Sequence, residues 1–237
     1  MSNHVLLNNV DHKDLRVITR RGASYGDNVM LAITFPSEFR ELQAHYPIAF
    51  RKTPDGISFE PVVLFGFQDG ENLFLEPELW DAAYVPLAIE RQPFLIGMTN
   101  GEPLVHVDLA SPRVSKADGE AVFLTHGGNT EFLERVNSTL LSIYQGVQST
   151  PAFVDALREH GLLESFVLDV ELDDGSQNRL SGFYTINEDK LSALGGDVIA
   201  GLHQSGYLQA IYMVLASLSN FRALIDRKNG AGRKQDA

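Results

Sequence analysis

The sequence predicts an α+β fold, with an antiparallel, β-rich N-terminal half and helices concentrated in the C-terminal half. Three turn signals separate apolar runs of strand length, at Asp55-Gly56, Asn100-Gly101 and Asp174-Gly175. Such dipeptides are typical of hairpins. From Asn129 onward the apolar residues recur with a helical period. A doubly wound parallel sheet would need helical crossovers, and the first half contains no pattern for them.

The expected strands of the first half are short and follow one another closely. They cover residues 28–35, 48–52, 57–67, 72–75, 93–98 and 103–109. A short helix is expected after Ser37, which can cap it, with Phe39 and Leu42 on its apolar face. Pro47 ends that helix, because the residue before a proline is pushed out of the helical region.

The second half is predicted to be mainly helical. Helices are expected over residues 129–148 and 151–160, the second opened by Pro151, since proline suits the first turn of a helix. A hairpin over 164–172 and 179–186 follows, and Asn187 caps a further short helix. The last two helices are expected over 197–204 and 207–227, and the apolar content of the final one predicts burial.

No long linker interrupts the chain of 237 residues. We therefore expect a single α+β domain over residues 1–229 and a small, polar, flexible tail over 230–237. The segment 110–121 is interpreted as a surface loop.

Composition narrows the function classes. A formal net charge of −12 repels phosphate backbones and anionic lipids, so no nucleic-acid partner is expected. The chain has no cysteine, which excludes disulfides and thiolate chemistry. No secretory signal opens the sequence and no run of 18 apolar residues occurs. These features predict an acidic cytoplasmic protein without membrane insertion.

Several segments carry a family resemblance: "HYPIAF", "FEPVVLFGFQDGENLFL", "WDAAYVPLAIERQPFLIG", "VDLASPRV", "LSGFYTINEDKLSALGGD" and "LHQSGYLQAIYMVLASLSNFRALIDRKN". On these the chain resembles the bacterial SapC family from near Val29 to near Asn229. The family's name comes from a surface-layer association. Many members look like cytoplasmic proteins encoded near TonB-dependent receptors, halogenase-like proteins and cupin-like oxygenases. The resemblance implies an accessory role in uptake or modification of a peptide or small metabolite, and it brings no catalytic residue with it.

Four residues form the predicted ligand-binding surface: Tyr46, Trp80, Tyr84 and Arg91. Arginine offers a two-pronged donor to a carboxylate, and aromatic side chains shape a pocket wall. The competing interpretation makes Arg91 a structural ion-pair partner of Glu90 or another acid. It also makes Tyr46 a buried ring with a hydrogen-bonded hydroxyl.

A metal site is a further alternative. His106 and Asp108 are two residues apart on an expected strand and therefore share one face. With His126 or His203 as a third ligand, they would suit an iron site. A structural or solvent-facing pair produces the same pattern.

The leading hypothesis is a non-enzymatic cytoplasmic binding or adaptor protein without a cofactor. Its partner would be a peptide or small-molecule ligand, or a modifying enzyme. A metal-dependent enzyme using His106 and Asp108 is the first alternative. A surface-layer-associated structural protein is the second.

Overall fold

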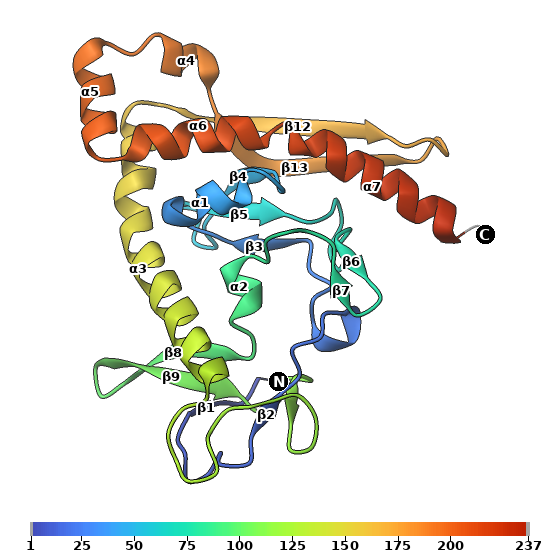
Figure 1. The fold of residues 1–237 in the computed structure, drawn as a ribbon. Helices are drawn as coiled ribbons and strands as arrows, with labels where there is room; N and C mark the ends of the chain where they lie inside the picture. Colours follow the sequence, from blue (N-terminus) through green and yellow to red (C-terminus); the bar gives the residue numbers. More distant parts are fainter. Residues whose placement is uncertain (1, 236–237) are drawn as a thin grey trace. The chain divides into compact units, whose positions relative to one another are not determined.

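The computed structural model describes residues 2–235 and has the α+β architecture that the sequence predicts (Figure 1). Every strand pair among the described residues is antiparallel. The chain divides into two compact units. Unit 1 comprises Met1–Asn28, Leu75–Asp81 and Val85–Gln145, and unit 2 comprises Val29–Phe74, Ala82–Tyr84 and Gly146–Ala237. That residues 1–229 act as one domain stays a prediction.

Unit 2 is built on a five-stranded sheet of order β12-β13-β4-β5-β3. Its strands are β3 (Leu31–Ile33), β4 (Ile48–Lys52), β5 (Phe59–Leu64), β12 (Leu163–Glu171) and β13 (Gln177–Ile186). The central strands are apolar without alternation, and Ile48, Val62 and Val63 are fully buried. Continuous burial of this kind indicates that both faces of the sheet centre are covered.

All three predicted hairpins are confirmed. Gly56 lies in the turn between β4 and β5, and Gly175 lies in the turn between β12 and β13. Asn100 and Gly101 join two strands of unit 1, with φ values of 54° and 84°. Positive φ at both central residues gives the turn a twist that matches the flanking strands, and Asn-Gly adopts it most readily.

Short helices and two longer ones complete unit 2. They are η2 (Pro36–Glu38), α1 (Phe39–Leu42), α4 (Glu188–Ser192), α5 (Gly196–Gln204), α6 (Tyr207–Ser217) and α7 (Asn220–Gln235). Helix α6 packs on β13, β4 and α1 (Figure 1). The predicted helix over 207–227 is thus two helices, separated by a turn at residues 218–219. Helix α7 continues through the predicted tail to Gln235, and Asp236 and Ala237 lie outside the described residues.

The stretch Tyr207–Ala231, which includes α6 and most of α7, meets the length and composition of a membrane span. Its most apolar 18-residue window has a mean hydropathy of 1.3 and is 28% buried. Ile211, Val214 and Leu224 of this stretch are buried. Apolar helices that cover a sheet in a soluble core meet the same criterion, so the absence of membrane insertion stays a prediction.

The prediction of two helices around Pro151 is wrong. One helix, α3 (Glu131–Glu159), runs through Pro151 without ending. Phe153, Val154 and Leu157, just after the proline, are fully buried. Their packing outweighs the loss of one backbone hydrogen bond at the proline. Helix α3 therefore contributes its first half to unit 1 and its second half to unit 2.

Unit 1 contains small sheets of order β1-β9-β8 and β10-β2-β11, and the pair β6-β7. The strands are β1 (His4–Leu6), β2 (Arg16–Val17), β6 (Leu75–Glu76), β7 (Leu79–Trp80), β8 (Phe94–Thr99), β9 (Glu102–Asp108), β10 (Val114–Ser115) and β11 (Glu120–Ala121). Two short helices, η1 (Ala23–Tyr25) and α2 (Leu87–Glu90), connect them. Phe94, Val107 and Val122 lie at the centre of its core with Leu133 and Leu140 of α3.

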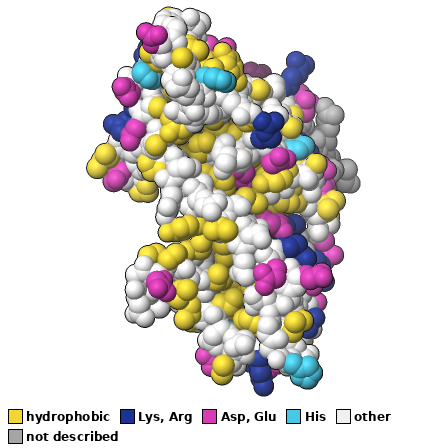
Figure 2. Space-filling view, turned by 60° about the vertical axis from the view of Figure 1, so that its left-hand side comes forward, with side chains coloured by type: hydrophobic (Ala, Val, Ile, Leu, Met, Phe, Trp, Pro, Cys, Tyr) yellow, Lys and Arg dark blue, Asp and Glu magenta, His cyan; other side chains and the backbone are white. Residues whose placement is uncertain are grey.

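Charged side chains are dispersed over the surface that Figure 2 shows. On this face Lys and Arg side chains stand singly among acidic and hydrophobic ones, without a continuous basic surface. That distribution agrees with the net charge of −12.

Candidate functional site

Two of the four predicted binding residues meet in unit 2. Tyr46 is fully buried, and its hydroxyl donates to the carbonyl oxygen of Tyr84. Its ring packs edge-on against Phe65 and Phe74. The hydroxyl of Tyr84 donates to Oε1 of Glu38 at 3.1 Å. The structure thus places Tyr46 in the core, where its hydroxyl holds the backbone of Tyr84.

The other two predicted residues belong to unit 1. Trp80 is a buried residue of β7 opposite Leu75. Arg91 follows α2, and its Nη1 donates to the carbonyl oxygen of Phe94 at 2.6 Å. Burial lowers the pKa of Arg91. Glu90 pairs with Arg21. A role of these four residues in binding stays a prediction.

The possible metal ligands lie on β9. The carboxylate of Asp108 accepts backbone N–H groups of Asn3 at 2.8 Å and Ala110 at 3.0 Å, and His4 Nε2 lies 3.8 Å from it. His106 Nδ1 lies 3.1 Å from the carbonyl oxygen of Leu104. Among residues 2–235, no group of three or more histidine and acidic side chains has the arrangement of a metal site.

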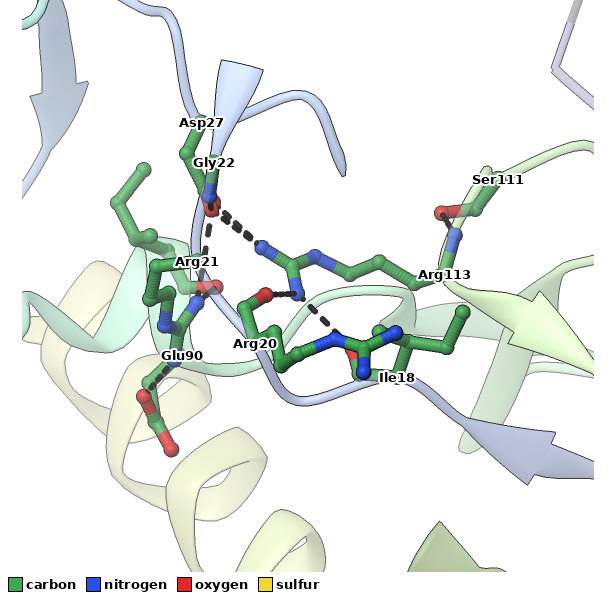
Figure 3. Close-up of polar contacts among 9 residues, drawn as sticks. Ile18, Arg20, Arg21, Gly22, Asp27, Glu90, Ser111 and Arg113 are labelled. Carbon is green, nitrogen blue, oxygen red and sulfur yellow. Dashed lines mark hydrogen bonds and ion pairs between the residues drawn. The ribbon is translucent and has the colours of Figure 1, made fainter. Parts of the chain in front are cut away.

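A buried ion pair organises the N-terminal segment of unit 1. Both carboxylate oxygens of Asp27 accept from Nη2 of Arg113 at 2.6 Å, and the side chains are 0% and 1% exposed. Nη1 of Arg113 donates to the carbonyl oxygens of Ile18 and Arg20 (Figure 3). One guanidinium therefore ties the segment from Ile18 to Asp27 to the strand that begins at Val114.

Arg21 extends this arrangement. Its Nη1 lies 3.8 Å from Asp27, and its Nη2 pairs with Glu90. Burial, with a smaller contribution from the like charge of Arg113, lowers the pKa of Arg21. The basic groups in Figure 3 are thus committed to acidic groups and carbonyl oxygens of the same unit, which is typical of a structural ion-pair network.

The interpretation of residues 110–121 as a surface loop holds only in part. The segment contains β10, β11 and the buried Arg113. A charged residue in a turn-rich sequence carries no local sign of burial, and the ion-pair partner is 86 residues away. The one sequence signal was the resemblance segment "VDLASPRV", which contains Arg113.

A polar pocket in unit 2 is the candidate site. Its cavity volume is about 490 Å³, within the range of small-ligand sites. Three walls enclose it: the loop after β5, the β12–β13 turn, and the middle of α7. The lining residues are Gln68, Glu71, Asn72, Leu73, Leu172, Asp173, Asp174, Ser176, Gln177, Asn178, Lys228, Asn229 and Ala231.

Each wall is bonded to the other two. Gln68 Nε2 donates to Oδ1 of Asn178 at 2.7 Å and joins the loop to β13. Lys228 Nζ pairs with Glu71 and joins α7 to the loop. The backbone N–H of Asp173 donates to Oδ1 of Asn229 at 2.9 Å and joins the turn to α7. These three polar contacts hold the walls together, so the fold itself fixes the shape of the pocket.

The shape of the loop wall depends on a close approach between the backbone at Gly66 and Glu71. The backbone N–H of Phe67 donates to Glu71 Oε2 at 2.8 Å, which folds the carboxylate back over the loop. A Cβ atom at Gly66 would lie 2.7 Å from the carbonyl oxygen of Glu71. Only glycine permits this approach, so Gly66 sets the position of Glu71 in the pocket.

Asn178 is the most enclosed polar group of the pocket. Its side chain is 7% exposed, and its Oδ1 accepts from Gln68. Within residues 2–235 its Nδ2 has no hydrogen-bond partner. This nitrogen is not among the buried side-chain atoms that lack a hydrogen bond, so solvent reaches it. Asn178 also lines a second pocket, with Asp169, Glu171 and Arg179.

Acidic side chains outnumber basic ones among the described residues that line the pocket. Glu71, Asp173 and Asp174 are acidic, and Lys228 is basic. Hydrogen bonds from the side chain and backbone of Ser176, and the more distant charge of Lys228, hold the pKa of Asp174 below its ordinary value. The carboxylate is therefore ionised at neutral pH.

Sequence reasoning treated the loop of this pocket as a turn only. Its residues come from segments that are far apart, so no local motif brings Gln68 to Asn178 or Glu71 to Lys228. The available signal was again the resemblance, because "FEPVVLFGFQDGENLFL" and "LSNFRALIDRKN" contain polar residues that line two of the three walls.

Comparison with known proteins gives one result. No curated protein and no solved structure matches the chain. The family model described as SapC matches residues 7–224, which is most of the sequence. The match includes two walls of the pocket, the loop after β5 and the β12–β13 turn. The chain therefore belongs to the SapC family.

Proposed function

We propose that this protein is a non-enzymatic binding or adaptor protein that holds a peptide or small polar metabolite in the polar pocket of unit 2. One observation carries the proposal: three chain segments are bonded to one another around a cavity of about 490 Å³ that is lined mainly by polar side chains.

The charged groups of the pocket suit recognition better than proton transfer. Glu71 is paired with Lys228 and accepts from the N–H of Phe67. The pKa of Asp174 is shifted down, away from neutral pH. A general acid or base works best with a pKa near the operating pH. An accessory role in the uptake or modification of the bound molecule is consistent with this chemistry.

The proposal is tested by NMR on the full chain labelled with ¹⁵N. Amino acids, dipeptides and polyols are titrated up to concentrations on the order of 10 mM, which detects weak binding. At least one compound should cause saturable shifts in the side-chain amides of Gln68 and Asn178. The proposal is wrong if no compound in the set shifts these resonances.

A metal-dependent enzyme has one observation in its favour, which is that His4 Nε2 lies 3.8 Å from the carboxylate of Asp108. Its test is the metal content discussed below.

A further inference from the structure

We infer that β12 is an interaction surface, on which a second copy of this chain adds its own β12 in antiparallel orientation and extends the sheet of unit 2 across both copies. β12 is the outermost strand of that sheet, and its one neighbour in the strand order is β13 (Figure 1). The residues that line the polar pocket lie outside β12, so the inference does not depend on the proposed function.

The backbone of β12 directs alternate residues toward β13 and away from it. Just after the strand, Leu172 donates its N–H to the carbonyl oxygen of Ser176 at 2.9 Å. Just before it, the carbonyl oxygen of Leu162 accepts from the N–H of Asn187 at 2.8 Å. Even-numbered residues therefore point their backbone groups at β13, and odd-numbered ones point theirs outward. Among the described residues, no backbone partner meets the outward groups of Leu163–Glu171.

This edge has little of the usual protection against pairing. Sheet edges are commonly protected by short length, a bulge, proline or charged side chains. β12 is nine residues long and contains neither proline nor lysine. The bulge of the hairpin lies in β13, where Ser181 and Gly182 together oppose Val167, so β12 itself is regular. Val167 is 51% exposed, and the half-buried Phe166 and Leu168 flank it. Acidic side chains are the remaining protection.

The acidic residues of β12 permit self-pairing in one register. They are Glu164, Asp169 and Glu171. A two-fold axis at Val167 is the arrangement that pairs the strand over its full length. It sets each acid opposite an uncharged residue of the second copy, namely Val170, Ser165 and Leu163 in that order. Acids then oppose one another neither directly nor on the diagonal, which are the positions where like charges weaken a strand pair.

The same register supplies favourable contacts. Val167 meets its own copy at the axis, and Phe166 faces Leu168 of the second copy. The outward residues exchange about ten backbone hydrogen bonds, two for each opposed pair. Such a self-complementary surface is what a two-fold dimer requires. An extended basic segment of another protein is the competing partner, and it is less favoured because Asp169 already lies 3.6 Å from Arg179.

Sedimentation of the full-length protein tests the surface with two matched variants. Val167 and Val147 are valines of nearly equal exposure, 51% and 49%, and Val147 lies on α3. We expect the wild type to be dimeric at concentrations on the order of 10–100 μM. Val167→Lys should raise the dimer dissociation constant at least about tenfold, because it sets two like charges opposite each other. Val147→Lys should leave the dimer unchanged.

Single cysteines test the register, because the chain has no cysteine of its own. Val167→Cys should give a disulfide-linked dimer on oxidation, since directly opposed residues have Cα atoms about 5.5 Å apart. Ser165→Cys should not, because its copy would lie four residues further along, about 13 Å away. A mixture of Ser165→Cys and Asp169→Cys should restore the cross-link, because these two positions oppose each other.

Three results would overturn the inference: a monomeric wild type, a dimer that Val167→Lys leaves intact, or equal cross-linking of Val167→Cys and Ser165→Cys. A monomer that binds a synthetic peptide of alternating lysine and valine in calorimetry would assign the edge to a basic partner strand instead. Salt separates the two partners, because screening strengthens the association of two acidic chains and weakens that with a basic peptide.

Discussion

Arg113 and Asp27 form a bifurcated ion pair in the interior of unit 1, in which both carboxylate oxygens lie 2.6 Å from the same guanidinium nitrogen. Both side chains are excluded from solvent. Removal of one partner leaves the other as an uncompensated buried charge, which costs far more than loss of a surface pair. The first prediction about stability therefore concerns this ion pair.

Asp27→Asn should lower the free energy of unfolding by about 3–5 kcal/mol, because Arg113 would stay buried without an anion. Urea unfolding of wild type and variant measures the difference. Asp155→Asn is the control, since Asp155 and Arg158 form an exposed pair 3.5 Å apart. Equal losses in the two variants would contradict the structural role of the buried pair.

Gly66→Ala should destabilise the loop wall of the pocket. The added Cβ would lie 2.7 Å from the carbonyl oxygen of Glu71, and overpacking of this kind costs about 1–3 kcal/mol. Gly201→Ala in α5 is the matched control, because nothing lies within 4 Å of its Cβ position. Alanine should stabilise that helix by about 0.5–1 kcal/mol. Urea unfolding should show opposite signs, and a stabilising Gly66→Ala would refute the close approach.

Asp108 should contribute to stability at neutral pH and lose that contribution in acid. The N–H of Asn3, and then those of Ala110 and the charge of His4, hold the pKa of Asp108 below its ordinary value. Its stabilisation is complete above the unfolded pKa of about 3.9 and disappears as pH falls through the lower folded pKa. Thermal melts of Asp108→Asn should therefore differ from wild type at pH 7 and converge with it in strong acid. A gap that persists unchanged in acid would show that the charge of Asp108 is not the cause.

His106→Ala should leave the iron and zinc content of purified protein unchanged. The Asp108 carboxylate already accepts two backbone N–H groups, and the His106 ring lies against Gly97. Elemental analysis of protein prepared without chelator provides the measurement. Stoichiometric metal that disappears in the variant would favour the metal-dependent enzyme.

Arg91→Ala separates two roles of that residue. Its Nη1 donates to the Phe94 carbonyl oxygen, so a structural role predicts a loss of unfolding free energy of about 1.5–3 kcal/mol. The binding role predicted from sequence gives a loss of the same size in ligand affinity, with little effect on the fold. Thermal melts beside titrations with trialanine, whose free carboxylate is the group that Arg91 would bind, assign the residue to one role or the other.

Local sequence signals predicted the fold well where the determining contacts are also local. Asn100-Gly101 adopts the expected turn, and Oδ1 of Asn187 accepts from the N–H of Lys190 at 2.8 Å, as a helix cap should. Pro151 shows the limit of such signals. Its local preference was outweighed by the burial of Phe153 and its neighbours, which only the tertiary structure reveals.

The candidate site could not be predicted in the same way. The bond from Gln68 to Asn178 spans 110 residues, and that from Arg113 to Asp27 spans 86. Both bonds connect polar residues in turn-like or strand-like sequence. The hydrophobic period of such a sequence does not indicate which distant residue a polar side chain will bond to. Tyr46 and Trp80 were predicted to bind a ligand because they are large aromatic residues near the ends of strands. Both are buried, and large rings that pack in a core give the same sequence pattern.

The interleaving of the two units along the chain has a consequence for biosynthesis. All residues of unit 1 lie before Gly146, whereas the sheet of unit 2 needs Val29–Phe74 together with the hairpin of β12 and β13. During translation the apolar strands β4 and β5 therefore emerge from the ribosome about a hundred residues ahead of β13. At about 5–20 residues per second this is a wait of about 5–20 seconds. Over that interval one edge of β4 has no neighbour from β13, and an unpaired apolar edge attracts other strands. Slowed elongation between residues 65 and 177 should thus raise the dependence of this protein on chaperones, while the same delay after Ile186 should matter much less.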